Sequence, residues 1–379
     1  MNLEDHLAAW LALARVPGVG PITGKRLLDH FEQPERILAA DLFALRGVPE
    51  LSLAQAQAIG ASRDFSGLCA EVEALAKQGI GLLVYDDPLY PERLRQIPDP
   101  PLVLYCRGAL TETDRAAVAV VGCRNPDVYG QAMATKLGAG LAQAGVTVVS
   151  GMARGIDSMA QQAALDAGGR TVAVLGTGVD VIYPPEHEAL YHAIVERGAV
   201  LSQFPPGAEP APGNFPVRNR IISGMSLGVV VVQAMSERSG SLITAKLALE
   251  QNREVYAVPG SAMSHAGRIT NRLIKQGARL VEEAEDILED LRPQLPGFSL
   301  GAPRLKAEGE SVSPELSSQE QRLYGLLPEL GEGSVHVDAL AAKSLLPVAE
   351  VSQHLLALEL AGLVKKLPGN YYVKIGKIG

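Results

Sequence analysis

Two short segments of the chain carry residue types suited to holding a phosphate group. Arg218, Asn219 and Arg220 stand in one run just before an apolar stretch, and residues 239–241 (SGS) open a segment with helical period. Backbone N–H groups at a helix start attract anions, and nearby guanidinium groups strengthen that attraction. The two segments therefore predict an anion-binding site rather than a pocket for an apolar substrate.

Glycines and arginines also follow the strand-like runs in the middle of the chain. Gly122, Gly151 and Gly176 stand at the ends of three apolar runs, and Arg124 and Arg154 follow the first two glycines closely. Because ligands of open parallel sheets bind beyond the carboxyl ends of the strands, these residues should line one edge of a sheet. Several cationic turns in a row predict a polyanion as the ligand rather than a single nucleotide.

Each of these residues also has a simpler explanation. A glycine after a strand is most often a tight turn, Arg154 could pair with Asp157, and Arg220 could anchor a loop. Asp157 could also cap the helix that follows it. Three arginines at a single edge are harder to explain in this way, and we favour the anion site.

The same region gives little indication of catalysis. Cys123 has no histidine nearby in the sequence, and we interpret it as a small turn residue; His187 and His192 lie in a separate segment. The chain contains no Gly-x-x-x-x-Gly-Lys-[Ser/Thr] motif, and residues 122–126 (GCRNP) replace the dinucleotide-binding glycine pattern with a cation and a proline. We therefore expect no catalytic residues, no enzymatic activity and no cofactor.

The sheet that positions these residues is predicted by continuous apolar runs rich in β-branched residues. Continuous runs, in place of alternating ones, are typical of parallel strands buried on both faces, and segments with helical period separate them. This pattern predicts an α/β fold, an extended Rossmann-like, doubly wound domain with a mainly parallel sheet. Two further strand-like runs, 81–85 and 102–105, precede it. The five main runs span residues 118–121, 146–149, 171–175, 227–232 and 254–258.

Patterns outside the sheet predict further domains. Near the amino end, helical stretches flank residues 17–20 (PGVG), and Lys25 and Arg26 follow. This arrangement is typical of a helix–hairpin–helix module whose amides contact a DNA phosphate, with an ordinary glycine turn as the alternative. The predicted domains are a helical helix–hairpin–helix (SAM-like) module at 1–80, the Rossmann-like domain at 81–291, a proline-rich linker at 292–317 and a winged helix at 318–379.

Composition narrows the class of protein. The 379 residues carry a formal net charge of −8, which argues against nucleic acid coating the whole surface but not against one cationic groove. No apolar run is long enough to cross a bilayer, and the amino-terminal residues lack a signal-peptide pattern. Cys69, Cys106 and Cys123 are odd in number and far apart, so neither a disulfide framework nor a zinc site is expected. We expect a reduced, cytoplasmic protein without metal or membrane contact.

Six segments, in one order along the chain, closely resemble the bacterial DNA-processing protein A family (DprA, also called Smf). The likeness is strong over about residues 80–290, and the flanking modules fit the architecture of that family. The segments are residues 120–124 (VVGCR), 150–157 (SGMARGID), 176–184 (GTGVDVIYP), 214–224 (NFPVRNRIISG), 239–245 (SGSLITA) and 257–260 (AVPG).

This resemblance implies a protein that binds single-stranded DNA without sequence specificity. Members of the family protect DNA taken up during natural transformation, load the RecA recombinase onto it, and are typically homodimers through the Rossmann-like domain. Carried over to matching positions, Arg124 and Arg154 would contact DNA phosphates. The full set of residues predicted to bind DNA is Gly122, Cys123, Arg124, Gly151, Met152, Ala153, Arg154, Gly155, Gly176, Thr177, Gly178, Arg218, Asn219, Arg220, Ser239, Gly240, Ser241 and Lys246.

Two residues depart from the pattern of the family. Cys123 stands where the family usually has Ser or Thr, which removes a hydroxyl donor, and Arg154 often appears as Lys, so that the charge is kept and a planar fork is added. Because only 4% of the residues are aromatic, we expect contact mainly with the DNA backbone and a steep dependence on salt. Tyr183, Phe204 and Phe215 are the nearby candidates for base stacking.

Two other functions stay open on the sequence. A nucleotide phosphoribohydrolase of the lysine-decarboxylase-like Rossmann family also has a phosphate-binding glycine turn that opens a helix. That family typically shows Pro-Gly-Gly-x-Gly-Thr with a catalytic Glu. Residues 239–244 match this pattern only loosely. A purely architectural dimer would bind no oligonucleotide at all.

The winged helix carries its own prediction. Its expected recognition segment, residues 347–361, contains no Lys or Arg and includes Glu350 and Glu359. A helix that enters the major groove normally carries cations. We therefore expect this domain to dock a protein or another domain, with at most weak DNA contact from three lysines of the wing, Lys365, Lys366 and Lys374.

Overall fold

The computed structural model of the chain describes residues 3–294, 318–328, 334–344, 346–360, 363–367 and 369–374. They belong to two compact units, one up to residue 304 and one from residue 305 onward. Apart from the single 3₁₀ turn η3 (Arg292–Gln294), the predicted linker at 292–317 lies outside the described residues. In the described ranges, no helix is both long and apolar enough to cross a membrane.

A single sheet dominates the first unit. Within residues 3–294 its nine strands follow the order β1-β2-β6-β5-β4-β3-β7-β8-β9, parallel from β6 to β9 and antiparallel at β1 and β2. The mainly parallel sheet confirms the predicted fold class. The strands are β1 (Gly81–Val84), β2 (Val103–Gly108), β3 (Ala117–Val121), β4 (Thr147–Ser150), β5 (Thr171–Val174), β6 (Ala199–Ser202), β7 (Gly228–Val231), β8 (Glu254–Ala257) and β9 (Arg279–Leu280).

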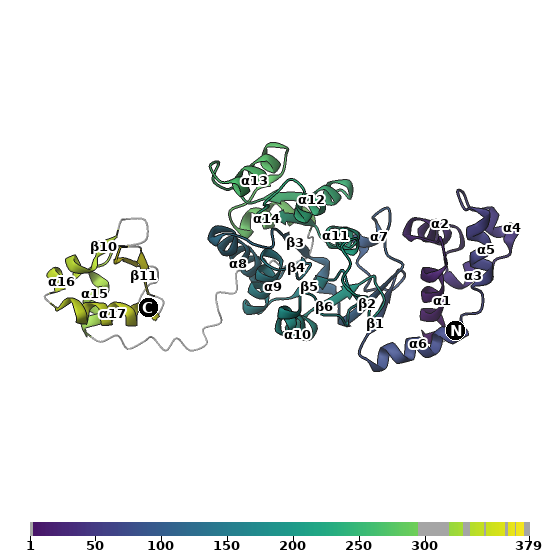
Figure 1. Ribbon diagram of the computed structural model, residues 1–379, viewed down its shortest axis with the longest axis horizontal. Helices are drawn as coiled ribbons and strands as arrows, with labels where there is room; N and C mark the ends of the chain where they lie inside the picture. The colour runs from purple at the N-terminus through teal and green to yellow at the C-terminus, as the bar shows by residue number, and fades with distance from the viewer. Residues whose placement is uncertain are drawn as a thin grey trace. The chain divides into compact units, whose positions relative to one another are not determined.

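Helices cover both faces of this sheet (Figure 1). In β3, Val118 and Val120 pack on the face under α8, α9 and α14, while Ala117 and Ala119 face α11 and α12. Alternate residues of one strand are therefore buried on opposite faces, as the continuous apolar runs predict. The helices of this domain are α7 (Glu92–Arg95), α8 (Val128–Gln143), α9 (Ile156–Asp166), α10 (Glu188–Arg197), α11 (Asn214–Gly224), α12 (Gly240–Glu250), α13 (His265–Lys275) and α14 (Ala284–Leu291), with 3₁₀ turns η1 (Glu112–Arg115) and η2 (Pro185–His187).

Strands β6 and β9 are not among the predicted strands. Strand β6 has only four residues and follows the end of α10 after the single residue Gly198. Strand β9 has two residues, both exposed, and joins only the edge of the sheet. Such short segments give no periodicity from which a strand could be predicted.

Six helices precede the sheet and share a hydrophobic core with it. Trp10 of α1 is fully buried in a cluster that continues into Val103 and Tyr105 of β2. Arg15, at the end of α1, forms an ion pair with Glu71 of α6 and donates a hydrogen bond to the Tyr105 hydroxyl. The helices are α1 (Leu3–Arg15), α2 (Pro21–Phe31), α3 (Pro34–Ala39), α4 (Leu42–Arg46), α5 (Leu53–Ala61) and α6 (Ser66–Lys77).

The predicted hairpin turn joins α1 to α2, and Gly18 there has a φ of 80°, which favours glycine. Its two cations are already engaged within the protein. Lys25 Nζ donates a hydrogen bond to the Ile97 carbonyl at 3.1 Å, and Arg26 pairs with Glu50 at 2.6 Å. A DNA phosphate at this turn would therefore have to compete with existing partners of both side chains.

The second unit has its own small core and confirms the predicted winged helix. Leu340 of α16 and Leu355 and Leu358 of α17 are fully buried in it. Strand β12 lies between β10 and β11 in an antiparallel sheet, and β11 and β12 form the wing. The described elements are α15 (Ser318–Gly325), β10 (Val335–His336), α16 (Val337–Ser344), α17 (Val348–Leu360), β11 (Val364–Leu367) and β12 (Tyr371–Lys374). Ser317, whose spacing to Glu320 in the sequence is that of a capping box, lies outside the described residues.

Candidate nucleic-acid interface

The carboxyl edge of the parallel sheet collects most of the residues predicted to bind DNA. Loops after β3, β4 and β5 meet there, beside the start of α11 and the start of α12. Strands β3 and β7 are neighbours in the sheet, although the chain between them first forms β4, β5 and β6 on the other side of β3. The strand order therefore reverses between β3 and β7, and open α/β sheets bind their ligands at the carboxyl ends of the strands beside such a reversal.

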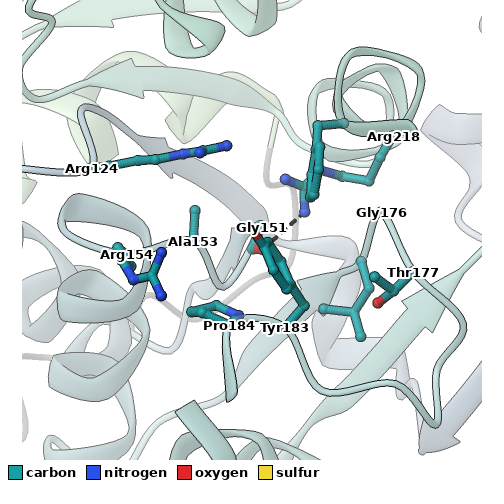
Figure 2. Close-up of a pocket in the computed structure, with 11 residues that line it drawn as sticks. Arg124, Gly151, Ala153, Arg154, Gly176, Thr177, Tyr183, Pro184 and Arg218 are labelled. Carbon is teal, nitrogen blue, oxygen red and sulfur yellow. Dashed lines mark hydrogen bonds between the residues drawn. The ribbon is translucent and has the colours of Figure 1, made fainter. Parts of the chain in front are cut away.

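One depression at this edge, which we call the arginine hollow, has a volume of about 400 Å³. Figure 2 shows Arg124 and Arg154 on one side of it and Arg218 on the other, so that three cations from separate segments surround one space. Tyr183 and Pro184 close another side. The hollow is lined by Arg124, Gly151, Ala153, Arg154, Leu175, Gly176, Thr177, Tyr183, Pro184, Phe215 and Arg218.

A second depression, the serine hollow, adjoins the first and has a volume of about 950 Å³. Arg124, Ala153, Phe215 and Arg218 line both hollows, so the two lie side by side. The serine hollow is lined by Val121, Gly122, Cys123, Arg124, Asn125, Ala153, Asp157, Phe215, Arg218, Asn219, Ile222, Met235, Ser239, Gly240, Ser241 and Thr244.

Arg218 is a fixed, buried cation between the hollows. Its Nη1 donates a 2.9 Å hydrogen bond to the Gly151 carbonyl and a further one to the Val174 carbonyl, and its Nε donates to Asn219 Oδ1 at 3.1 Å. Burial lowers the pKa of Arg218 to about 10, against the opposing effect of the Asp157 carboxylate. The guanidinium therefore stays charged near neutral pH and supplies a preorganised positive potential.

The Asp157 carboxylate acts electrostatically on the Arg218 guanidinium from the first turn of α9. Asp157 is buried at the start of α9, and its carboxylate accepts a 3.1 Å hydrogen bond from the Gly151 N–H. Burial raises the pKa of Asp157, while the positive charge of Arg218 and the Gly151 N–H act in the opposite direction. Asp157 is thus the counter-charge of Arg218. The alternative that Asp157 pairs with Arg154 is wrong, because Arg154 pairs with Glu186.

The Arg218 guanidinium lies so close to residue 151 that only glycine fits there. A Cβ at residue 151 would lie 2.5 Å from both terminal nitrogens of that group, which three hydrogen bonds hold in place. The Gly151→Ala variant should therefore lower the free energy of unfolding by about 1–3 kcal/mol, because the added methyl group must either crowd the Arg218 guanidinium or displace it. Urea denaturation measures this loss.

Gly240 offers the matched control for this change. A Cβ there would meet nothing nearer than Asn219 Nδ2 at 4.0 Å. The Gly240→Ala variant should stay within about 0.5 kcal/mol of the original protein. Equal losses in the two variants would contradict the assigned role of Gly151.

Arg124 and Arg154, the other two arginines of the arginine hollow, differ in the interactions of their side chains. Arg124 is exposed and, among the described residues, its only partner is the ring of Phe215, whose centroid lies 5.8 Å from Arg124 Cζ. Arg154 is about half exposed and forms an ion pair with Glu186. A phosphate can therefore reach Arg124 directly, whereas at Arg154 it has to displace a carboxylate.

The start of α12 presents unused donors to the serine hollow. Ser239 is the N-cap residue, but its hydroxyl accepts from the Ser236 N–H instead of capping the helix. Ser241 is 5% exposed, and its buried Oγ has no hydrogen-bond partner. An oxyanion in the serine hollow would satisfy this hydroxyl and the first amides of the helix together.

Thirteen of the eighteen predicted residues line at least one hollow, and five line neither. Met152 points its side chain into the core, and Gly178 is held by a backbone hydrogen bond to Ala208. Gly155, with a φ of 80°, packs its Cα against the carbonyls of the loop after β3. These three residues shape the loops rather than line the hollows. The other two, Arg220 and Lys246, lie outside both hollows.

Arg218, Asn219 and Arg220 are buried residues of α11, the helix that connects β6 to β7. Arg220 faces away from the hollows and donates hydrogen bonds to the Asp99 carbonyl and the Gln203 side chain. It thus anchors the segment before β2, as the simpler explanation has it. Lys246 is exposed and pairs with Glu250.

Two polar side chains illustrate what the sequence did not predict at the site. Glu186, the partner of Arg154, lies in η2, and Asn125 lines the serine hollow. A single acidic residue in a loop carries no pattern that connects it to an arginine 32 positions earlier. Asn125 stands directly after Arg124, and its place in the β3 loop is the signal that could have found it.

The chain is an extended Rossmann-like protein with three arginines at the carboxyl edge of its sheet, and along the sequence a helical tandem precedes that domain and a winged helix follows it. Residues 81–292 match the family described as DNA recombination-mediator protein A, and this match covers more than half of the chain. The chain therefore belongs to the DNA-processing protein A (DprA/Smf) family. Residues 11–60 match a SAM-like helix-hairpin-helix tandem, and residues 307–370 match the DprA winged helix domain.

Individual relatives agree with this assignment. Protein Smf of Synechocystis is 36% identical over 97% of this chain and 99% of its own length, and Protein Smf of Escherichia coli is 42% identical over 76% of each. The crystal structure of DNA processing protein A from Streptococcus pneumoniae is similar with a TM-score of 0.66 and 33% identity, covering 75% of this chain and 97% of that one. A structure of DNA processing protein A from Helicobacter pylori, described by its single-stranded DNA binding mode, has a TM-score of 0.51 and 29% identity, covering 57% and 96%.

Proposed function

We propose that this protein binds single-stranded DNA without sequence specificity, mainly through the phosphate backbone. The observation that carries the proposal is the pair of neighbouring hollows, one lined by Arg124, Arg154 and Arg218 and the other by the start of α12. Its donors are guanidinium groups, amides and a hydroxyl, which suit phosphate oxygens and read no base edges. The single-stranded DNA binding mode described for the Helicobacter pylori protein supports the same ligand for this chain.

We further propose that the bound strand is incoming DNA, which the protein protects and passes to the RecA recombinase during natural transformation. In this proposal the protein acts in the cytoplasm as a homodimer through the Rossmann-like domain and performs no chemistry itself. Membership of the DNA-processing protein A family supports this role. The winged helix would then dock a protein or a domain, because α17 carries no cation along its length.

Binding of oligonucleotides at several salt concentrations tests the proposed ligand. We expect tighter binding of a single-stranded than a double-stranded oligonucleotide, and a linear fall of the logarithm of the binding constant with the logarithm of salt concentration. A flat salt plot would refute contact with phosphates. Deletion of residues 318–379 should leave single-strand binding in place, and loss of that binding would refute the role given to the winged helix.

A nucleotide phosphoribohydrolase is the alternative from another class, favoured by the unpaired Ser241 hydroxyl at the start of α12. Incubation with nucleoside monophosphates separates the two functions. Steady release of free base, lost when Ser241 is replaced by alanine, would favour the enzyme. We expect no release of base.

A further inference from the structure

His6 of α1 lies where the amino-terminal helices meet the loop after β1. Its Nδ1 lies 2.7 Å from Glu35 Oε1 of α3, and its Nε2 lies 3.1 Å from Asp86 Oδ2 of that loop. The same Nε2 accepts a 3.2 Å hydrogen bond from the indole N–H of Trp10, one turn further along α1. The imidazole thus connects three segments of the chain, and we call these four residues the His6 link.

The Nε2 atom of His6 cannot bind Trp10 and Asp86 at the same time. In the neutral ring with its proton on Nδ1, Nε2 is an acceptor for the Trp10 N–H and has no proton to offer the Asp86 carboxylate. In the charged ring both nitrogens are donors, so Nε2 binds Asp86 and the indole N–H loses its acceptor. Trp10 is fully buried and has no other acceptor among the described residues, so this loss costs free energy.

Glu35 favours the charged form of the ring. Its Oε2 is buried without a hydrogen-bond partner, and within the described ranges His6 is the only cation that pairs with this carboxylate. Burial lowers the pKa of His6, but the hydrogen bond to Glu35 and the charges of Asp86 and Glu35 outweigh burial, so the pKa lies above its ordinary value. The two forms of the ring therefore exchange close to neutral pH.

The other charged and titratable groups around α1 have partners of their own and leave Nε2 to Trp10 and Asp86. They are Asp5, which accepts from Cys69 of α6, Arg15, which pairs with Glu71 of α6, and Tyr85 of the loop after β1, which lies under Arg95 and feels the charge of Asp29 of α2.

We propose that the His6 link makes the attachment of the amino-terminal helices to the sheet depend on pH. When Nε2 takes up one proton from solvent, it exchanges the Trp10 indole for the Asp86 carboxylate and ties α1 and α3 to the loop after β1. When the proton leaves, Nε2 returns to the indole and this tie is released.

Trp10 reports this exchange directly, because it is the one tryptophan of the chain. The fluorescence of the full chain should change in a single step between about pH 5 and about pH 9, with a midpoint above about 6.5, the ordinary pKa of histidine. The His6→Gln variant should lose the step, because its side chain does not titrate. His30→Gln is the matched control, since the exposed His30 ring packs on Phe31 in α2, and it should keep the step.

The Asp86→Asn variant tests the acceptor of the charged ring. Its midpoint should fall by about 0.5 pH unit, the shift expected of one exposed ion pair. Because the pKa of His6 is raised in the folded chain, the link stabilises the fold below the ordinary pKa, and this contribution is lost as the pH rises through the folded pKa. The urea midpoint of Asp86→Asn should therefore lie below that of the unaltered protein at about pH 6 and equal it at about pH 9.

Three outcomes would refute the proposal: a midpoint at or below the ordinary pKa, a step that survives His6→Gln, or a midpoint that Asp86→Asn leaves in place. An equal loss of stability at both pH values in Asp86→Asn would also refute it, because Asp86 would then have only a packing role. If His6→Gln does not fold, the unaltered chain and Asp86→Asn still decide, since Asp86 is exposed. None of these measurements uses DNA, so their result is independent of the proposed function.

Discussion

Replacing Arg124 and Arg154 together with alanine should reduce the affinity for a single-stranded oligonucleotide by about 100-fold or more. Each guanidinium lines the arginine hollow from a different loop, and a hydrogen bond to a charged group contributes about 1.5–3 kcal/mol, of which each 1.4 kcal/mol is a factor of ten. The slope of the salt plot should fall by about 1.4, because each phosphate contact on a single strand contributes about 0.7. Anisotropy titrations at several salt concentrations measure both effects.

A variant with Arg36 and Lys77 replaced by alanine is the control for this change. It removes the same charge from exposed positions on α3 and α6, each already paired with a neighbouring glutamate. Since salt screens such distant charges, its affinity should stay within about threefold of the original protein. Equal losses in the two double variants would show that net charge, and not the hollow, governs binding.

The single variants should also differ in a defined order. Arg124 is free of carboxylate partners among the described residues, whereas Arg154 must first leave Glu186. The Arg124→Ala loss should therefore exceed the Arg154→Ala loss. The reverse order would mean that Arg154 is the primary contact.

Replacing Asp157 with alanine should lower the free energy of unfolding by about 3–5 kcal/mol, because it leaves the buried charge of Arg218 without its counter-charge. The change also removes the acceptor of the Gly151 N–H. Urea denaturation followed by circular dichroism measures this loss.

The double variant Asp157→Asn, Arg218→Met identifies the cause of that loss. If the uncompensated charge dominates, removing both charges should recover much of the stability that Asp157→Ala loses. A loss below about 1 kcal/mol for Asp157→Ala would contradict the charge balance assigned to the pair.

Much of this architecture follows from local pattern in the sequence. The central strands are continuous apolar runs, and the glycines that end them mark the carboxyl edge, so the place of the site could be predicted. Gly151 and Gly155 show the limit of the same reasoning. Their missing side chains leave room for Arg218 and for the loop after β3, a packing role that the glycine pattern alone does not show.

Side-chain direction could not be predicted in the same way. Arg218 and Arg220 are two residues apart on α11 and therefore point about 200° apart around the helix axis. One lies between the hollows, and the other anchors the segment that precedes β2. In the sequence the two arginines look equivalent, and their opposite directions become evident only once both are placed on a helix. The ion pair of Arg154 with Glu186 is likewise set by tertiary packing.

The shared core of the amino-terminal helices and the sheet has a consequence for cooperativity. Trp10 and the residues around it are buried against β2, so the helices of residues 3–77 cannot come away without exposing the sheet. Unfolding of residues 3–294 should then be one transition, and a ligand that binds only the folded state stabilises everything within it. A strand held at the carboxyl edge would thus raise the melting temperature of helices that it never touches.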